Sequence, residues 1–174
     1  MTKSILRKYA KLIVKMGVNI KKGQGAVILV DTAQSEIALM VAEEAYRAGA
    51  KWVDIRWTNQ DLDKMRYKKE SVKVLSATQE WEKARMQYEL DELPVRIWID
   101  SDDPDGLKGV NVEKMQKANL ARMKVRKPYR DAMENKYQWT IVAVPSAKWA
   151  KKVFPNDRTS VAVKKLWDAI LQTV

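Results

Sequence analysis

Apolar residues along the chain follow two kinds of pattern, which predict alternating strands and helices. Four short apolar runs bounded by turn residues predict β-strands: GAVILVD (25–31), KWVDIRWT (51–58), PVRIWID (94–100) and QWTIVAVP (138–145). Apolar residues at helical spacing predict a helix over about 4–17, before the first strand, and another over about 33–48, after it. Two helices capped by Asn59 and Thr78 follow the second strand, and a basic helix over about 111–127, ending near Pro128, follows the third. Short links favour parallel strands. We therefore expect an α/β fold with an open, mostly parallel sheet of about four or more strands, covered by helices in Rossmann-like layers.

The composition of each strand predicts its place in the sheet. The runs AVILV and TIVAV are apolar on both faces, as buried central strands are. The other two strands alternate: Asp54 and Arg56 share a face of the second, and Arg96, Trp98 and Asp100 share a face of the third. We expect the first and fourth strands at the centre, and the second and third nearer an edge or a partner surface.

The length and the end of the chain bear on its domain organisation. The 174 residues are 46% hydrophobic, enough to bury one core, so we expect a single α/β domain over residues 1–174. The last segment, SVAVKKLWDAILQTV, places Leu166, Trp167, Ile170 and Val174 at helical spacing and stops on an apolar residue without a glycine or asparagine cap. Natural chain ends are usually polar and poorly ordered. We therefore expect a further domain to follow in the complete polypeptide.

The absence of two residue types excludes much chemistry. The chain has no histidine and no cysteine, so Ser-His-Asp and Cys-His arrangements are impossible, and a zinc site would have to use carboxylates alone. The lack of cysteine fits a reducing cytoplasm. No run approaches the ~18 apolar residues of a membrane span, and lysines interrupt the N-terminal apolar residues that a signal peptide would need. We expect a cytoplasmic protein with no membrane partner.

The net charge of +11 makes nucleic acid a candidate partner. Eight basic residues lie between Lys108 and Arg130, with Glu113 the one acidic residue among them. On a helical wheel these cations spread around most of the circumference, and no aromatic ladder accompanies them. A solvated basic helix is therefore favoured over nucleic-acid binding, and a stand-alone basic module for an acidic partner or nucleic acid stays as the alternative function.

Sequence motifs for nucleotide or metal binding are missing. The turn after the first strand, VDTAQSE, lacks the glycines of a dinucleotide fingerprint, and neither a GxxxxGK[ST] loop nor a GxSxG elbow occurs. The loop SDDPDGLKGV (101–110) matches a calcium loop when Gly106 takes the sixth position, but Val112 then replaces the required glutamate. A strand-to-helix turn with Asn111 as helix cap explains this loop better.

Some polar residues still lie where open α/β sheets bind ligands, at the carboxyl ends of strands. The candidate cleft or interface positions of this kind are Asp31, Ser101, Asp102 and Asp103. Arg122 shares a helix face with apolar residues, so we expect it to be partly buried and to form an ion pair. An aspartate from a neighbouring loop is the candidate partner, and contact with a ligand is the alternative. Trp149 either packs within its own helix or walls a cleft. We predict no catalytic, cofactor-binding or metal-binding residue in this chain.

Five segments carry a family resemblance: LRKYAKLIVKMGVNIKKGQ, VAEEAYRAGAKWVDI, SDDPDGLKGV, KPYRDAM and WTIVAVPSAKWAKKVFP. In order along nearly the whole chain, they resemble the N-terminal part of the thermophilic metalloaminopeptidases of the aminopeptidase T and aminopeptidase S type. The resemblance implies a cytosolic, dimeric exopeptidase in which an N-terminal α/β domain precedes a catalytic domain with two divalent metal ions, of zinc or cobalt type.

The resemblance also implies what this chain lacks. The family's metal ligands lie in the C-terminal half, and none of them falls on this sequence. We therefore expect an N-terminal, non-catalytic domain that supports or shapes the cleft of a catalytic domain in the same polypeptide, and that is inactive alone. An intact enzyme with a carboxylate-only site is a further alternative.

Overall fold

The computed structural model describes residues 1–173 and contains one sheet of four parallel strands in the order β2-β1-β3-β4. The strands are β1 (Gly25–Asp31), β2 (Trp52–Thr58), β3 (Val95–Asp100) and β4 (Trp139–Ala143). Their alternating apolar residues form the core: Ala26, Ile28 and Val30 of β1 face the same side as Val95 and Ile97 of β3, all nearly or fully buried. The predicted open parallel sheet is confirmed.

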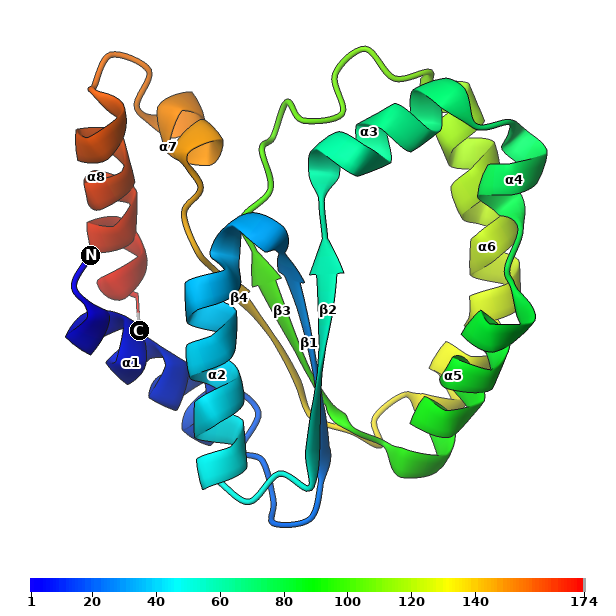
Figure 1. The fold of residues 1–174 in the computed structure, drawn as a ribbon, viewed down its shortest axis with the longest axis horizontal. Helices are drawn as coiled ribbons and strands as arrows, with labels where there is room; N and C mark the ends of the chain where they lie inside the picture. The colour runs from blue at the N-terminus through cyan, green and yellow to red at the C-terminus, as the bar shows by residue number, and fades with distance from the viewer. Residues whose placement is uncertain (174) are drawn as a thin grey trace.

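Helices cover only one face of this sheet (Figure 1). They are α1 (Lys3–Leu12), which continues as a π-helical turn (Ile13–Gly17), α2 (Ser35–Arg47), which follows a 3-10 turn (Thr32–Gln34), α7 (Ala147–Val153) and α8 (Thr159–Leu171). The two ends of the chain meet here, because Tyr9 of α1 and Trp167 of α8 pack edge to face with ring centres 5.7 Å apart. Val174, which the apolar pattern placed on the last helix, lies outside the described residues.

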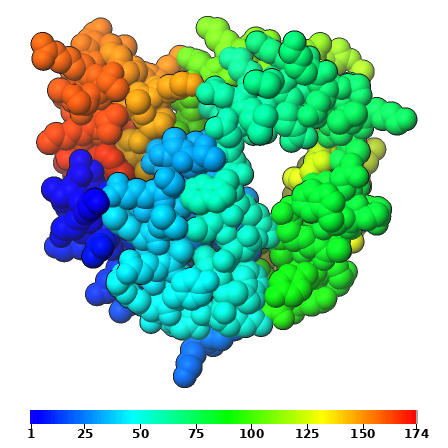
Figure 2. Space-filling view, in the orientation of Figure 1, coloured from blue at the N-terminus to red at the C-terminus, as the bar shows by residue number. Residues whose placement is uncertain are grey.

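The other four helices form an arm that projects from the sheet and curves beside its second face (Figure 1). The arm consists of α3 (Gln60–Lys69), α4 (Val72–Ser76), α5 (Glu80–Glu92) and α6 (Val112–Met133). Figure 2 shows an opening between this arm and the rest of the molecule. The second face of the sheet is therefore largely uncovered.

The predicted order of strands is wrong for two of them. β3 lies at the centre, and β4 lies at an edge, where Trp139 and Ile141 are 58% and 61% exposed. The prediction assumed helices on both faces, so that apolar strands would be central. Because one face is open, a central strand carries polar residues there and an edge strand carries exposed apolar ones.

Two predicted helix ends are also wrong. The basic helix, α6, continues past Pro128 to Met133, although a proline inside a helix removes one hydrogen bond and costs about 3 kcal/mol. Burial of Met133, which is 4% exposed, and the ion pair from Lys127 to Asp131 oppose that loss. At α5 the N-cap is Gln79 rather than Thr78, because the Glu82 carboxylate accepts a hydrogen bond from the Gln79 N–H at 2.9 Å.

The accessible surface is large for the mass. It measures 10689 Å² for a chain of 20.1 kDa. A compact monomer of that mass exposes about 8,700 Å². The excess of roughly 2,000 Å² reflects the projecting arm and the uncovered sheet face.

Candidate functional site

The polar residues at the carboxyl ends of the strands surround one pocket of about 410 Å³. It is lined by Asp31, Thr32, Ala33, Asn59, Gln60, Asp61, Ser101, Asp102, Asp103, Ser146, Ala147 and Lys148. The structure thus brings together four of the six candidate positions, Asp31, Ser101, Asp102 and Asp103. Asp31 also caps the turn that follows β1, since its carboxylate accepts a hydrogen bond from the Ala33 N–H at 2.8 Å.

A glutamine at the start of α3 holds the 101–110 loop in place. The Gln60 side-chain amide donates to the Asp103 carbonyl oxygen at 3.0 Å and accepts from the Asp103 N–H at 3.0 Å. A Cβ atom at Gly106 would lie 2.2 Å from the Gln60 amide carbon, so only glycine leaves room for this clamp. Lys152 of α7 pairs with Asp105 at 2.6 Å and fastens the other side of the loop. The loop is thus anchored on two sides.

Four carboxylates, which we call the acidic rim, crowd this edge: Asp31, Asp63, Asp100 and Asp102. Burial raises the pKa of Asp102, and the negative charges of Asp100, Asp31 and Asp63 raise it further. Burial also raises the pKa of Asp63, with Arg66 opposing the rise and Asp31 adding to it. Within residues 1–173, no lysine or arginine nitrogen lies within 4.0 Å of any of the four. The rim therefore favours a positively charged group beside it.

The rim does not provide the ligands of a metal ion. Across residues 1–173 no three histidine, cysteine, aspartate or glutamate side chains are grouped so that they could hold one. A dinuclear centre needs several such ligands around two adjacent ions. The donor set of the described residues does not fit a metal pair.

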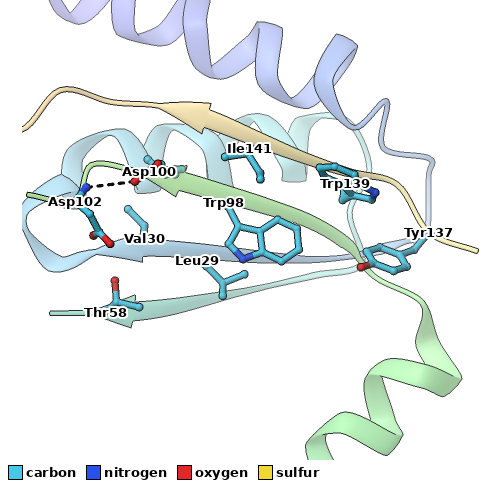
Figure 3. A pocket seen from close by; sticks show the side chains of 10 residues that line it. Leu29, Val30, Thr58, Trp98, Asp100, Asp102, Tyr137, Trp139 and Ile141 are labelled. Carbon is cyan, nitrogen blue, oxygen red and sulfur yellow. Dashed lines mark hydrogen bonds between the residues drawn. The ribbon is translucent and has the colours of Figure 1, made fainter. Parts of the chain in front are cut away.

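An apolar trough continues from the rim along the open face of the sheet, with a volume of about 500 Å³ (Figure 3). It is lined by Leu29, Val30, Thr58, Trp98, Ile99, Asp100, Asp102, Tyr137, Trp139 and Ile141. Asp100 and Asp102 stand at one end, and Tyr137 and Trp139 at the other (Figure 3). Trp98 and Trp139 pack edge to face with ring centres 6.4 Å apart. Trp98 is half-buried and Trp139 is exposed, and tryptophan rings that are accessible in a concave apolar surface are typical of a binding site.

Beyond the trough lies a third hollow, of about 280 Å³, which we call the arginine pocket. It is lined by Leu29, Arg56, Glu82, Arg85, Met86, Glu89, Arg96, Arg126, Tyr129, Arg130, Met133 and Tyr137. At its base Glu89 of α5, 3% exposed, accepts hydrogen bonds from Arg56 of β2 and Arg96 of β3. This buried ion cluster ties the arm to the sheet.

The other two candidate positions lie away from the pocket of the strand ends. Arg122 joins α6 to the segment before α5: it donates to the Ala77 carbonyl oxygen at 2.5 Å and pairs with Glu82. The expectation of a paired, partly buried arginine is confirmed, but its partner is a helix glutamate, not a loop aspartate. Trp149 packs beside the cluster of Ala150 and Leu166 between α7 and α8.

The trough and the arginine pocket were not predicted from the sequence. One signal was present, because Arg96 and Trp98 share a face of the third strand. We interpreted that face as the sign of a strand near an edge, and it is instead the floor of the hollow surface.

The fold and these surfaces define an α/β domain with a one-sided sheet, and residues 2–174 match the thermophilic metalloprotease (M29) family, to which the chain belongs. It is 34% identical over 173 residues to aminopeptidase PepS of Streptococcus thermophilus, covering 98% of this chain and 42% of that protein. It is 31% identical over 168 residues to aminopeptidase T of Thermus thermophilus, covering 96% and 41%.

A solved structure, wild-type AmpT from Thermus thermophilus, has the same fold. The TM-score is 0.83 at 29% sequence identity, and the match covers 98% of this chain and 43% of that one. The chain therefore spans about two fifths of the length of the relatives it matches. The family resemblance found in the sequence is confirmed.

Among the helices of residues 1–173, none has both the length and the apolar character that crossing a membrane requires.

Proposed function

We propose that this chain is the N-terminal, non-catalytic domain of a dinuclear-metal aminopeptidase, an exopeptidase that releases N-terminal residues from peptides. One observation carries the proposal: nearly the whole chain matches aminopeptidases, yet it accounts for only 42% of one and 41% of another. The partner that this implies is a C-terminal catalytic domain in the same polypeptide. Residues 1–174 then form one domain of two.

The metal ions of such an enzyme, two divalent ions of zinc or cobalt type in this proposal, belong to the other domain. Residues 1–173 do not group the ligands that they need. When bound, such ions activate a water molecule against a peptide bond. This chain contributes no step of that chemistry, and its part is to support or shape the cleft.

The uncovered sheet face is where we place the catalytic domain. A stable interface of standard size buries about 800 Å² on each partner, and the surface excess of roughly 2,000 Å² is large enough to supply it. The trough holds exposed apolar side chains, among them Trp139 and Ile141, at 58% and 61%. A domain opposite this face would convert the trough into one wall of a closed cleft.

Two measurements test the proposal. Incubated with aminoacyl reporter substrates and zinc or cobalt, the purified chain should show no turnover above a blank with metal alone; turnover would mean a carboxylate-only enzyme instead. The reading frame of the gene should continue past Val174 into a segment with histidines and acidic residues. A stop codon directly after Val174 would overturn the two-domain proposal.

The alternative of a basic binding module gains no support from the structure. On α6, Lys117 pairs with Glu113 and Lys127 with Asp131, so part of the positive charge is neutralised within the helix. Affinity for random duplex DNA that falls steeply with salt would support the module, because contacts to several phosphates release counterions. The homodimer and the cytoplasmic location implied by the family resemblance remain part of the proposal.

A further inference from the structure

The three hollows of the open side form one continuous surface. The pocket at the strand ends and the trough share Asp102 in their linings. The trough and the arginine pocket share Leu29 and Tyr137. The surface therefore runs along β1 and β3, from the acidic rim over an apolar floor to the arginines.

The two ends of this surface carry opposite charge. At one end, the four carboxylates of the acidic rim have no cation within ion-pair distance among the described residues. At the other, five arginines and two glutamates line the arginine pocket, and one of these arginines, Arg130, also lies 3.6 Å from Asp131, so two positive charges are in excess. Glu89 pairs with Arg56, Arg96 and Arg85, and Glu82 pairs with Arg122; within residues 1–173 no carboxylate lies within ion-pair distance of Arg126. Burial and the nearby charges of Arg122 and Arg85 lower the pKa of Arg126.

We propose that this surface binds an unblocked peptide of about four residues in a fixed direction, with its α-ammonium at the acidic rim, its apolar side chains on Trp98 and Trp139, and its terminal carboxylate at Arg126 and the neighbouring arginines. The length follows from the strands. Arg96, the second residue of β3, belongs to the arginine pocket, and Asp100, its last residue, belongs to the acidic rim; the four residue steps between them, of about 3.3 Å each, span roughly 13 Å. An extended tetrapeptide separates its charged ends by a similar distance.

The direction of the peptide is set by charge complementarity. An occupant must present a cation and an anion at opposite ends of an apolar segment, and a free peptide does so through its own termini. The peptide would run antiparallel to β1 and β3. The inference rests on the proposed function in one respect, because peptides are the substrates and products of an aminopeptidase. The binding itself needs neither the catalytic domain nor a metal.

The test is a titration of the 174-residue chain with the peptide Ala-Leu-Leu-Ala in the presence of EDTA, followed by tryptophan fluorescence and calorimetry. We expect saturable binding, with a fluorescence change that is smaller in Trp139→Phe, because Trp98 still reports on the peptide. N-acetylation and C-amidation should each weaken binding about fivefold, since one partly exposed ion pair contributes up to about 1 kcal/mol.

Two variants assign the ends. Asp102→Asn should reduce the effect of acetylation, and Arg126→Gln should reduce the effect of amidation. Arg7→Gln, an exposed arginine of α1 on the covered side of the sheet, is the matched control and should change neither effect.

Two results would overturn the inference. One is the absence of saturable binding by the folded chain. The other is binding that neither cap weakens, which would indicate an apolar surface without preferred direction, for example one that a second protein segment covers. Either result leaves the two-domain proposal standing, because that proposal is decided by the reading frame and by turnover.

Discussion

Replacing Glu89 by glutamine tests whether the buried ion cluster holds the arm to the sheet. The Glu89 side chain is 4% exposed, and its partners Arg56 and Arg96 are 19% and 16% exposed. Removing one member of a buried ion pair leaves a charge without compensation and costs about 3–5 kcal/mol. Because both guanidinium groups keep some contact with water, we expect the lower value, about 3 kcal/mol. That is a large fraction of the 5–15 kcal/mol by which domains are usually stable.

Urea denaturation measures this loss. With a slope of about 2 kcal/mol per molar urea, a loss of about 3 kcal/mol lowers the midpoint by roughly 1.5 M. Glu80→Gln is the matched control, because Glu80 lies on the same helix, pairs with Lys83 and is 87% exposed. We expect it to move the midpoint little. If Glu89→Gln shifted the midpoint no more than Glu80→Gln does, the cluster would not be a source of stability and this reasoning would fail.

Three further substitutions probe the loop, the rim and the arm. Gly106→Ala should displace Gln60 and break its two hydrogen bonds, at a cost of about 1–3 kcal/mol. In a Gln60→Ala background the same substitution should have little added effect. Additive losses of stability in urea denaturation would contradict the clamp. Asp102→Asn should raise the melting temperature at pH 7, because the raised pKa of Asp102 means that its ionised carboxylate destabilises the folded state. This destabilisation is present above the folded pKa and absent below the usual aspartate pKa of about 3.9. A gain in melting temperature that persists at pH 3 would refute this origin. For Glu82 the sign is opposite: burial alone would raise its pKa, but the Gln79 N–H and Arg122 lower it. Glu82→Gln should therefore destabilise the fold at pH 7. The stabilities of the variant and the wild type should converge as the pH falls through the folded pKa, which lies below the usual value of about 4.3.

Local patterns in the sequence were sufficient to predict the elements and several of their ends. Asn59 and Asn111 cap α3 and α6 as predicted, each accepting a hydrogen bond at 2.9 Å from the N–H three residues on. All four strands lie where the apolar runs placed them. These features depend on neighbouring residues alone, so a single sequence contains the information for them.

Long-range packing explains what local patterns could not predict. Strand order was wrong because the apolar residues of β4, such as Ile141, face an open surface, and because Arg96 of central β3 finds its counter-charge in Glu89, on a helix that precedes it. The continuation of α6 through Pro128 likewise depends on where Met133 packs. Of the site, the strand-end residues were predicted from the rule for α/β sheets. The trough was not, since no local pattern shows that a sheet face lacks its helices.

The uncovered sheet face also has a consequence for the heat capacity of this protein. Trp139 and Ile141 are hydrated in the native chain, so unfolding exposes less new apolar surface than in a fully covered domain of the same length. The heat-capacity increment of unfolding should then lie below the usual value of about 12–15 cal/mol/K per residue. Whatever covers the face, a peptide or a catalytic domain, releases that hydration water and binds with a negative heat-capacity change. The sign and size of this change would therefore report on how much of the open face a partner covers.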